Sequence, residues 1–313
     1  MKIFLSTVKR GSKKHQLTGC LFELHPENFS AIKKIDITEP TTAQGFWNPR
    51  GGNRGARGLT VHNGTLYVAT ATVIRKYDLN LNYLGEINNK KLAGLHSIHA
   101  DKHGILALST LHDLVVKIDF KGNTLWEWHG HRSKLLQKKF KFTGRTIDFN
   151  VYNKNETAMQ SYINDDRLHF SGSCVHNGRI FILSGKRGCI IEVCSPTTDK
   201  IHLYDKTLNS AHDIVFINNL MYVNSTRNQN VHVYHGTKHI KTLNSKIYRP
   251  HTQVNQFSTV GWQRGLCKYD ENTLLVGTSP LTVFLLDVRT GKVKDKKKLD
   301  NDIKHCSYSL LVV

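Results

Sequence analysis

The stretch RGLTVHNGTLYVATATVIRKYDLNLNYLGEI, residues 57–87, reads as four short β-strands separated by turns. Apolar and polar residues alternate up to the turn HNG, and the second strand that follows ends in small residues. The stretch HDIVFINNLMYVNSTRNQNVHVYHGTKHIKTL, residues 212–243, repeats this pattern, and Tyr67 and Tyr222 follow the two opening residues at the same spacing. A recurring four-stranded unit indicates the blade of a β-propeller, because a single blade cannot bury both of its faces.

Three further copies of the unit begin at His96, Ser171 and Arg264. The C-terminal KHCSYSLLVV resembles a first strand without partners, whereas the N-terminal KIFLSTVKRG, GCLFELHP and AIKKIDI resemble strands two to four of another unit. Pairing these leftovers removes exposed sheet edges that would otherwise invite aggregation. The sequence therefore predicts an all-β chain, residues 1–313, that forms one six-bladed β-propeller domain. Its blades have four antiparallel strands, and the C-terminal strand closes the ring by joining the N-terminal strands.

Three longer insertions interrupt the repeat, at residues 39–55, 129–166 and 244–261. Each insertion precedes a first strand, so we expect all three on one face of the propeller, where they form a lid or a substrate wall. Their aromatic residues either line the mouth of a pocket or anchor the loops. These residues are Trp47, Tyr248 and His251, together with Trp262 just beyond the last insertion.

The formal net charge of +20 is the strongest feature of the composition. It predicts an acidic partner or an anionic substrate drawn in by the field of the protein. The lysines are dispersed and no nucleic-acid-binding motif accompanies them, so nucleic acid is a disfavoured partner that the charge alone does not exclude. The chain has no apolar run long enough to span a bilayer, and its six cysteines show no CxxC pair. The short apolar stretch at the N-terminus meets Lys9 and Arg10 too soon for a signal peptide, so we expect none. We expect a monomeric cytoplasmic protein with reduced thiols.

The residues that open the six repeats carry most of the chemistry. In the expected order around the ring they are His305, Arg57, His96, Ser171, His212 and Arg264. First strands line the channel of a propeller, so these side chains should face its axis. Five of the six are His or Arg, a pattern that packing alone does not explain. His169, two residues before Ser171, should point the same way, and together these residues predict a central site.

Several blade motifs resemble known propeller families. HSIHADKHGILAL with the trailing GNTLWEW resembles repeats of the arylsulfotransferase-like propellers. GWQRGLC with LLVGTSP, and AHDIVF with MYVNS, resemble a family of uncharacterised bacterial propeller proteins. The first resemblance implies sulfuryl transfer through a channel histidine, assisted by further histidines and an arginine. In this chain it implies His305 as the nucleophile, with His96, His212 and Arg264 assisting.

Three functions remain open from the sequence. In the one we favour, an enzyme binds a divalent transition metal, Zn, Fe or Cu, through His96, His212 and His305. Arg57 and Arg264 then hold a carboxylate, phosphate or sulfate substrate. In the second, His305, His212 and His96 are the catalytic groups of a metal-free sulfuryl transfer. In the third, the protein is a binding scaffold for an acidic partner. Further substrate contacts are expected from His169, Ser171 and Trp262.

Overall fold

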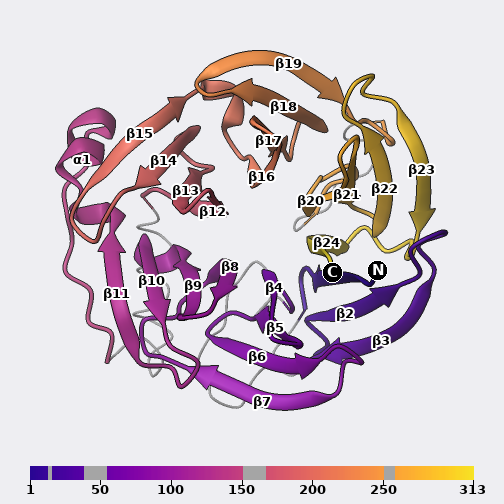
Figure 1. Ribbon diagram of the computed structural model, residues 1–313, viewed down its shortest axis with the longest axis horizontal. Helices are drawn as coiled ribbons and strands as arrows, with labels where there is room; N and C mark the ends of the chain where they lie inside the picture. Colours follow the sequence, from indigo (N-terminus) through magenta and orange to yellow (C-terminus); the bar gives the residue numbers. More distant parts are fainter. Residues whose placement is uncertain (13–15, 39–54, 151–166, 250–257) are drawn as a thin grey trace. The chain divides into compact units, whose positions relative to one another are not determined.

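The computed structural model describes residues 1–12, 16–38, 55–150, 167–249 and 258–313. The chain forms a β-propeller of six blades, each a sheet of four antiparallel strands (Figure 1). The predicted fold class and blade count are confirmed. Among the described residues, two compact units can be distinguished: a first unit with residues 1–38, 55–57 and 210–313, and a second unit with residues 58–209. Each unit holds three blades.

The first unit contains the blade in which both ends of the chain meet. Its strands are, in sheet order, β24 (His305–Val312), β1 (Ile3–Lys9), β2 (Gly19–Leu24) and β3 (Ala31–Ile37). The next blade of the unit consists of β16 (His212–Ile217), β17 (Leu220–Ser225), β18 (Asn230–His235) and β19 (Lys238–Asn244). The last consists of β20 (Leu266–Asp270), β21 (Thr273–Thr278), β22 (Thr282–Asp287) and β23 (Val293–Lys298).

The second unit contains the remaining three blades. One consists of β4 (Leu59–His62), β5 (Thr65–Ala69), β6 (Val73–Asp78) and β7 (Tyr83–Asn88). The next consists of β8 (Leu95–Asp101), β9 (Gly104–Ser109), β10 (Leu114–Ile118) and β11 (Thr124–His129). The third consists of β12 (Phe170–His176), β13 (Arg179–Ser184), β14 (Cys189–Val193) and β15 (Asp199–Tyr204). A short helix, α1 (Lys134–Phe140), follows β11, and the side chain of Ser133 caps it by accepting from the Leu136 N–H.

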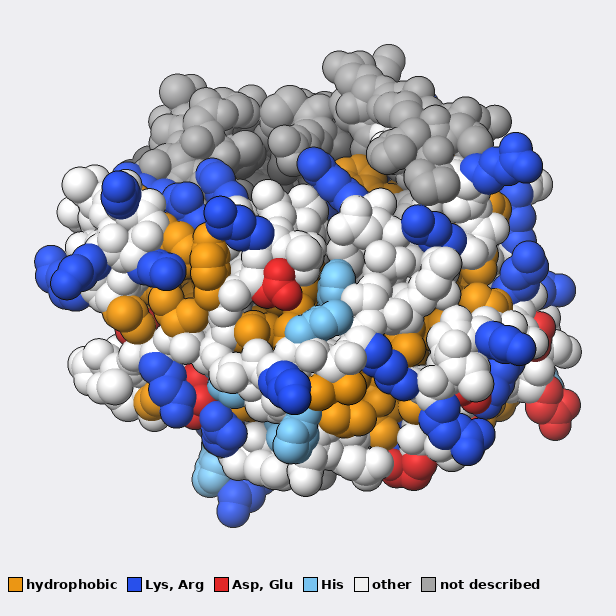
Figure 2. Space-filling view, turned by 90° about the horizontal axis from the view of Figure 1, so that it is seen from above, with side chains coloured by type: hydrophobic (Ala, Val, Ile, Leu, Met, Phe, Trp, Pro, Cys, Tyr) orange, Lys and Arg blue, Asp and Glu red, His pale blue; other side chains and the backbone are white. Residues whose placement is uncertain are grey.

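Burial within a blade follows the order of its strands. Every residue of β9 and of β21 is buried, because the second strand of a blade is covered on both faces. The fourth strands are open to solvent, and β23 carries the run Lys296–Lys298 at its exposed end. Figure 2 shows Lys and Arg side chains spread over the face in view rather than gathered in one patch. On this face and on β23, Lys and Arg side chains are thus exposed to solvent.

The pairing of the chain ends is as predicted. β24 runs antiparallel to β1, with Ile3 opposite Val312 and Lys9 opposite His305. Lys2 and Val313 extend this ladder by one residue pair: the Lys2 N–H donates to the Val313 carbonyl at 2.8 Å, and the Val313 N–H donates to the Lys2 carbonyl at 2.9 Å. The C-terminal strand therefore supplies the first strand of the blade that begins with the N-terminal residues.

The insertions are described only in part. Residues 39–54, 151–166 and 250–257, with Trp47 and His251, lie outside the described residues, so the lid expected there stays a prediction. All six cysteines are free thiols. Cys20, Cys189 and Cys306 are buried, Cys174 and Cys267 are half-buried, and Cys194 is exposed. In the part of the chain that the structure describes, no helix is long and apolar enough to cross a membrane.

Candidate functional site

Three first strands carry a β-bulge close to a histidine. The register of β8 shifts between Leu95 and Ile98, that of β12 between Phe170 and Gly172, and that of β16 between His212 and Ile214. A bulge places two residues opposite one and so changes the direction of the side chains beside it. His96 lies within the bulge of β8, His212 begins the bulge of β16, and His169 directly precedes the bulge of β12. His169 itself is in the left-handed region, with φ of 50°.

The ring of His96 is held through its Nδ1 atom. Nδ1 lies 3.0 Å from the carbonyl oxygen of Gly94 and 3.0 Å from Oγ1 of Thr110. A carbonyl only accepts, so Nδ1 carries the proton and donates it. The Thr110 hydroxyl donates its own proton to the Phe170 carbonyl, at 2.6 Å, and therefore accepts from His96. These contacts fix the tautomer in which Nε2 of a neutral His96 bears the lone pair.

His212 has the same environment in its own blade. Its Nδ1 lies 3.1 Å from the carbonyl oxygen of Ser210 and 2.7 Å from Oγ1 of Thr226. In both cases the carbonyl belongs to the residue two positions earlier and the threonine to the residue fourteen positions later. The ring again carries its proton on Nδ1, and Nε2 is the nitrogen suited to binding a metal.

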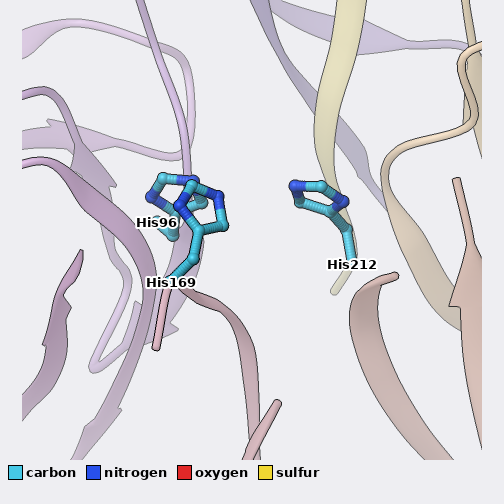
Figure 3. Close-up of side chains that lie close together, drawn as sticks. All are labelled: His96, His169 and His212. Atoms are coloured by element: carbon cyan, nitrogen blue, oxygen red, sulfur yellow. The ribbon is translucent and has the colours of Figure 1, made fainter. Parts of the chain in front are cut away.

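His169 adds a third imidazole directly before β12. Within the second unit its ring packs edge-on against that of His96, with centroids 5.2 Å apart and an interplanar angle of 82°. His96, His169 and His212 form a group of three histidines that can hold a metal ion (Figure 3). Neutral imidazole nitrogens suit Zn, Fe or Cu.

This group differs from the predicted ligand set in its third member, because His305 is bonded elsewhere. In the first unit, Nδ1 of His305 lies 2.7 Å from Oδ2 of Asp300, and Nε2 lies 2.8 Å from Oγ1 of Thr7. Burial lowers the pKa of His305, and the neighbouring Asp300 carboxylate partly offsets this. Both ring nitrogens are thus engaged within the protein, so His169 replaces His305 in the group of three.

The two predicted anion-binding arginines are both buried in the first unit. Arg57 is 3 % exposed and Arg264 is 7 % exposed. The guanidinium carbons of Arg57 and Arg264 lie 5.9 and 5.3 Å from the centre of the Tyr308 ring, and that of Arg264 lies 5.3 Å from the centre of the Trp262 ring. The remaining predicted contact, Ser171, is buried at the start of β12 in the second unit.

Comparison with known proteins places the fold but not the activity. No protein-family model matches the chain. No curated protein matches it either. Among solved structures, a chain of a nidogen–laminin complex matches with a TM-score of 0.60 at 11 % identity, over 98 % of this chain and 97 % of that one. A Bacteroides caccae protein of unknown function matches with a TM-score of 0.59 at 9 % identity, over 99 % and 98 %. These likenesses show the fold alone.

An enzyme also occurs among the similar structures. A catalytically inactive variant of virginiamycin B lyase from Staphylococcus aureus, solved with quinupristin, matches with a TM-score of 0.52 at 12 % identity. The match covers 80 % of this chain and 72 % of the lyase. At this identity the fold is shared, and the activity of the lyase is a property of that protein.

Sequence reasoning missed the groups that orient the histidines. Thr110 directly follows β9 and Thr226 directly follows β17, the second strands of their blades. In both places the strand ends in a serine, so the sequence reads Ser-Thr at 109–110 and at 225–226. This recurrence was the available signal. Asp213, directly after His212, lies outside the three-histidine group; it accepts from the Gly265 N–H at 2.9 Å, and burial raises its pKa to about 7.

Proposed function

We propose that this protein is a metal-dependent enzyme that acts on a small anionic substrate. His96, His169 and His212 bind one divalent transition-metal ion, Zn, Fe or Cu. The observation that carries the proposal is the matched environment of His96 and His212. Each donates Nδ1–H to a carbonyl and a threonine hydroxyl.

That environment is the one that metal-binding histidines require. A ligand imidazole donates a hydrogen bond from the N–H of its second ring nitrogen to a carbonyl or another acceptor, which fixes the ring and increases the basicity of the coordinating nitrogen. Two histidines in different blades with identical second contacts are not expected if each merely fills space. Three protein nitrogens leave a coordination position open, and a bound metal would supply Lewis-acid chemistry at that position.

The arginines support the anionic character of the substrate. Arg57 and Arg264 keep their charge at any physiological pH and are buried, and buried guanidinium groups bind oxyanions strongly. Trp262 and Ser171 remain the proposed further contacts with the substrate.

The alternative functions receive less support. Sulfuryl transfer through His305 needs a nucleophilic nitrogen that faces a substrate, whereas Nε2 of His305 faces the fully buried hydroxyl of Thr7. A scaffold for an acidic partner requires no particular histidine tautomer. It would explain the net charge of +20 but not the shared contacts of His96 and His212.

Elemental analysis of protein purified without a His-tag tests the proposal. We expect about one Zn, Fe or Cu per chain, lost in each of His96→Ala, His169→Ala and His212→Ala. His103→Ala removes an exposed histidine and should retain the metal. His305→Ala should also retain it, because its nitrogens are bonded to Asp300 and Thr7.

Two results would contradict the proposal. One is wild-type protein that binds no metal after reconstitution with each ion. The other is metal that survives all three single substitutions. Circular dichroism on each variant ensures that loss of metal is not loss of fold.

A further inference from the structure

The first unit contains a series of alternating guanidinium groups and aromatic rings. Cζ of Arg10 lies 3.5 Å from the centre of the Trp262 ring, and Arg264 lies 5.3 Å from both the Trp262 and the Tyr308 ring centres. The series ends at Arg57, whose Cζ lies 5.9 Å from the centre of the Tyr308 ring. We call these five residues the arginine ladder. Its three guanidinium groups carry permanent charges, and all three arginines are buried.

Two members of the arginine ladder are buried donors without an acceptor among the described residues. These donors are Nε of Arg264 and Nε1 of Trp262. A guanidinium and an indole N–H can only donate, so neither can be satisfied by another donor. The hydroxyl of Thr278, at the end of β21, also has no partner among the described residues.

Backbone hydrogen bonds bring these three residues to one place in their blade. The Arg264 N–H donates to the Gly277 carbonyl at 2.9 Å, directly before Thr278. The Trp262 N–H donates to Oγ of Ser279 at 3.1 Å, directly after it. Thr278 also follows Arg264 by the same fourteen positions that separate His212 from Thr226, whose side chains are in contact.

We propose that Arg264, Trp262 and Thr278 form an oxyanion-binding site for the phosphate or sulfate group of the substrate; this rests on the proposed anionic substrate. An oxyanion offers only acceptors, which is what two donor-only groups and a hydroxyl require. Arg10 and Arg57 lie across the two aromatic rings and add positive potential, which favours a doubly charged group over a carboxylate.

Calorimetric titration with inorganic phosphate, sulfate and acetate tests this site. Wild-type protein is titrated both metal-loaded and after chelator treatment, so failure of the metal site and failure of the anion site give separate results. We expect phosphate and sulfate to bind in both forms and more tightly than acetate. Absence of phosphate and sulfate binding would overturn the site, and equal affinity for acetate would overturn its assignment to a doubly charged group.

Substitutions locate the binding. Arg264→Gln should weaken phosphate binding by about tenfold or more, because it removes a charge-assisted hydrogen bond. Arg227→Gln, which removes the same charge from an exposed position, should leave the affinity unchanged. Trp262→Phe keeps a ring for the flanking arginines and removes only the indole N–H, so it should weaken binding less than Arg264→Gln. Equal affinity in wild type and Arg264→Gln would overturn the assignment.

The Thr278→Val variant distinguishes two possible partners of the Thr278 hydroxyl, a bound anion and a buried water. If the hydroxyl has no partner until the anion binds, the variant should melt at the same temperature as wild type or higher, yet bind phosphate several-fold more weakly. If an ordered water already satisfies the hydroxyl, the variant should melt lower and bind phosphate as wild type does. That second outcome would contradict the proposed role of Thr278.

Discussion

Each of the two threonines beside His96 and His212 does more than fill space. Oγ1 of Thr110 and of Thr226 lies at 3.0 and 2.7 Å from the Nδ1 atom of its histidine. Valine has the same shape and keeps the packing, but it cannot accept from Nδ1–H. The histidine then loses the threonine acceptor of its Nδ1–H, so its ring is less firmly oriented and its Nε2 is less basic.

We therefore expect Thr110→Val and Thr226→Val each to weaken metal binding by about 10- to 100-fold, the usual cost of removing such a second contact. Competition with a chromophoric chelator measures the affinity. Thr72→Val is the matched control, since Thr72 is a buried threonine whose hydroxyl has no partner among the described residues. Unchanged metal affinity in both Thr110→Val and Thr226→Val would show that the two threonines do not act on the metal site.

At the scale of elements, the position of β8 depends on a close approach to the residue that precedes β4. A Cβ atom at Gly58 would lie 2.8 Å from the His96 carbonyl oxygen, 2.8 Å from Cα of Ser97 and 2.9 Å from the Ile98 nitrogen. All three are backbone atoms, so the strand itself must move to make room. His96 and Ser97 also lie within the bulge of β8, between Leu95 and Ile98.

Gly58→Ala should consequently shift His96, lower the metal affinity and lower the melting temperature. The control is Gly178→Ala, where a Cβ meets nothing within 4 Å but φ is +71°. That variant should lose stability through backbone strain alone and bind metal as wild type does. If Gly58→Ala loses stability and keeps its metal affinity, the packing of β8 does not control the histidine.

The same elements show what the sequence can predict. The blade period located His96 and His212, and the unpaired N- and C-terminal strands predicted the pairing of β1 with β24, because both are repeat properties. His169 lies just before β12 with a positive φ, so strand alternation says nothing about its direction. His305 is held by Asp300, which lies five positions earlier and outside any strand, and neither hydrophobic period nor spacing signals that contact. The third histidine of the group therefore depends on local features that no repeat pattern reveals, namely the positive φ of His169 and the bond between His305 and Asp300.

At the scale of the whole molecule, buried neutral histidines link stability to pH. His112 and His131 are fully buried, and burial lowers the pKa of each to about 3. In the unfolded chain their imidazoles titrate near 6.5. Between these values the unfolded state binds more protons than the folded state, so the stability from these residues is complete above about pH 6.5 and is lost as the pH falls.

Lowering the pH from 7 to 5 should therefore reduce the free energy of unfolding by about 2 kcal/mol for each of the two histidines. Urea unfolding at a series of pH values measures the slope. His112→Leu and His131→Leu remove the titrating groups and should flatten the slope, whereas His103→Ala, at an exposed position, should not. A stability that is the same at pH 5 and pH 7 would refute the linkage.

The pairing of β24 with β1 also determines when this protein can finish folding. Ser6 and Ser309, bonded across that pair, are 303 positions apart in the chain. During synthesis β1 therefore leaves the ribosome long before the strand that covers its edge has been made. Of the six sheets described, the one that begins to emerge first is completed last, and its open edge needs protection until β24 has been made. Joining residues 2 and 313 by a short linker and reopening the chain in the turn at Asn63–Gly64 would make that pairing local and shorten the exposure.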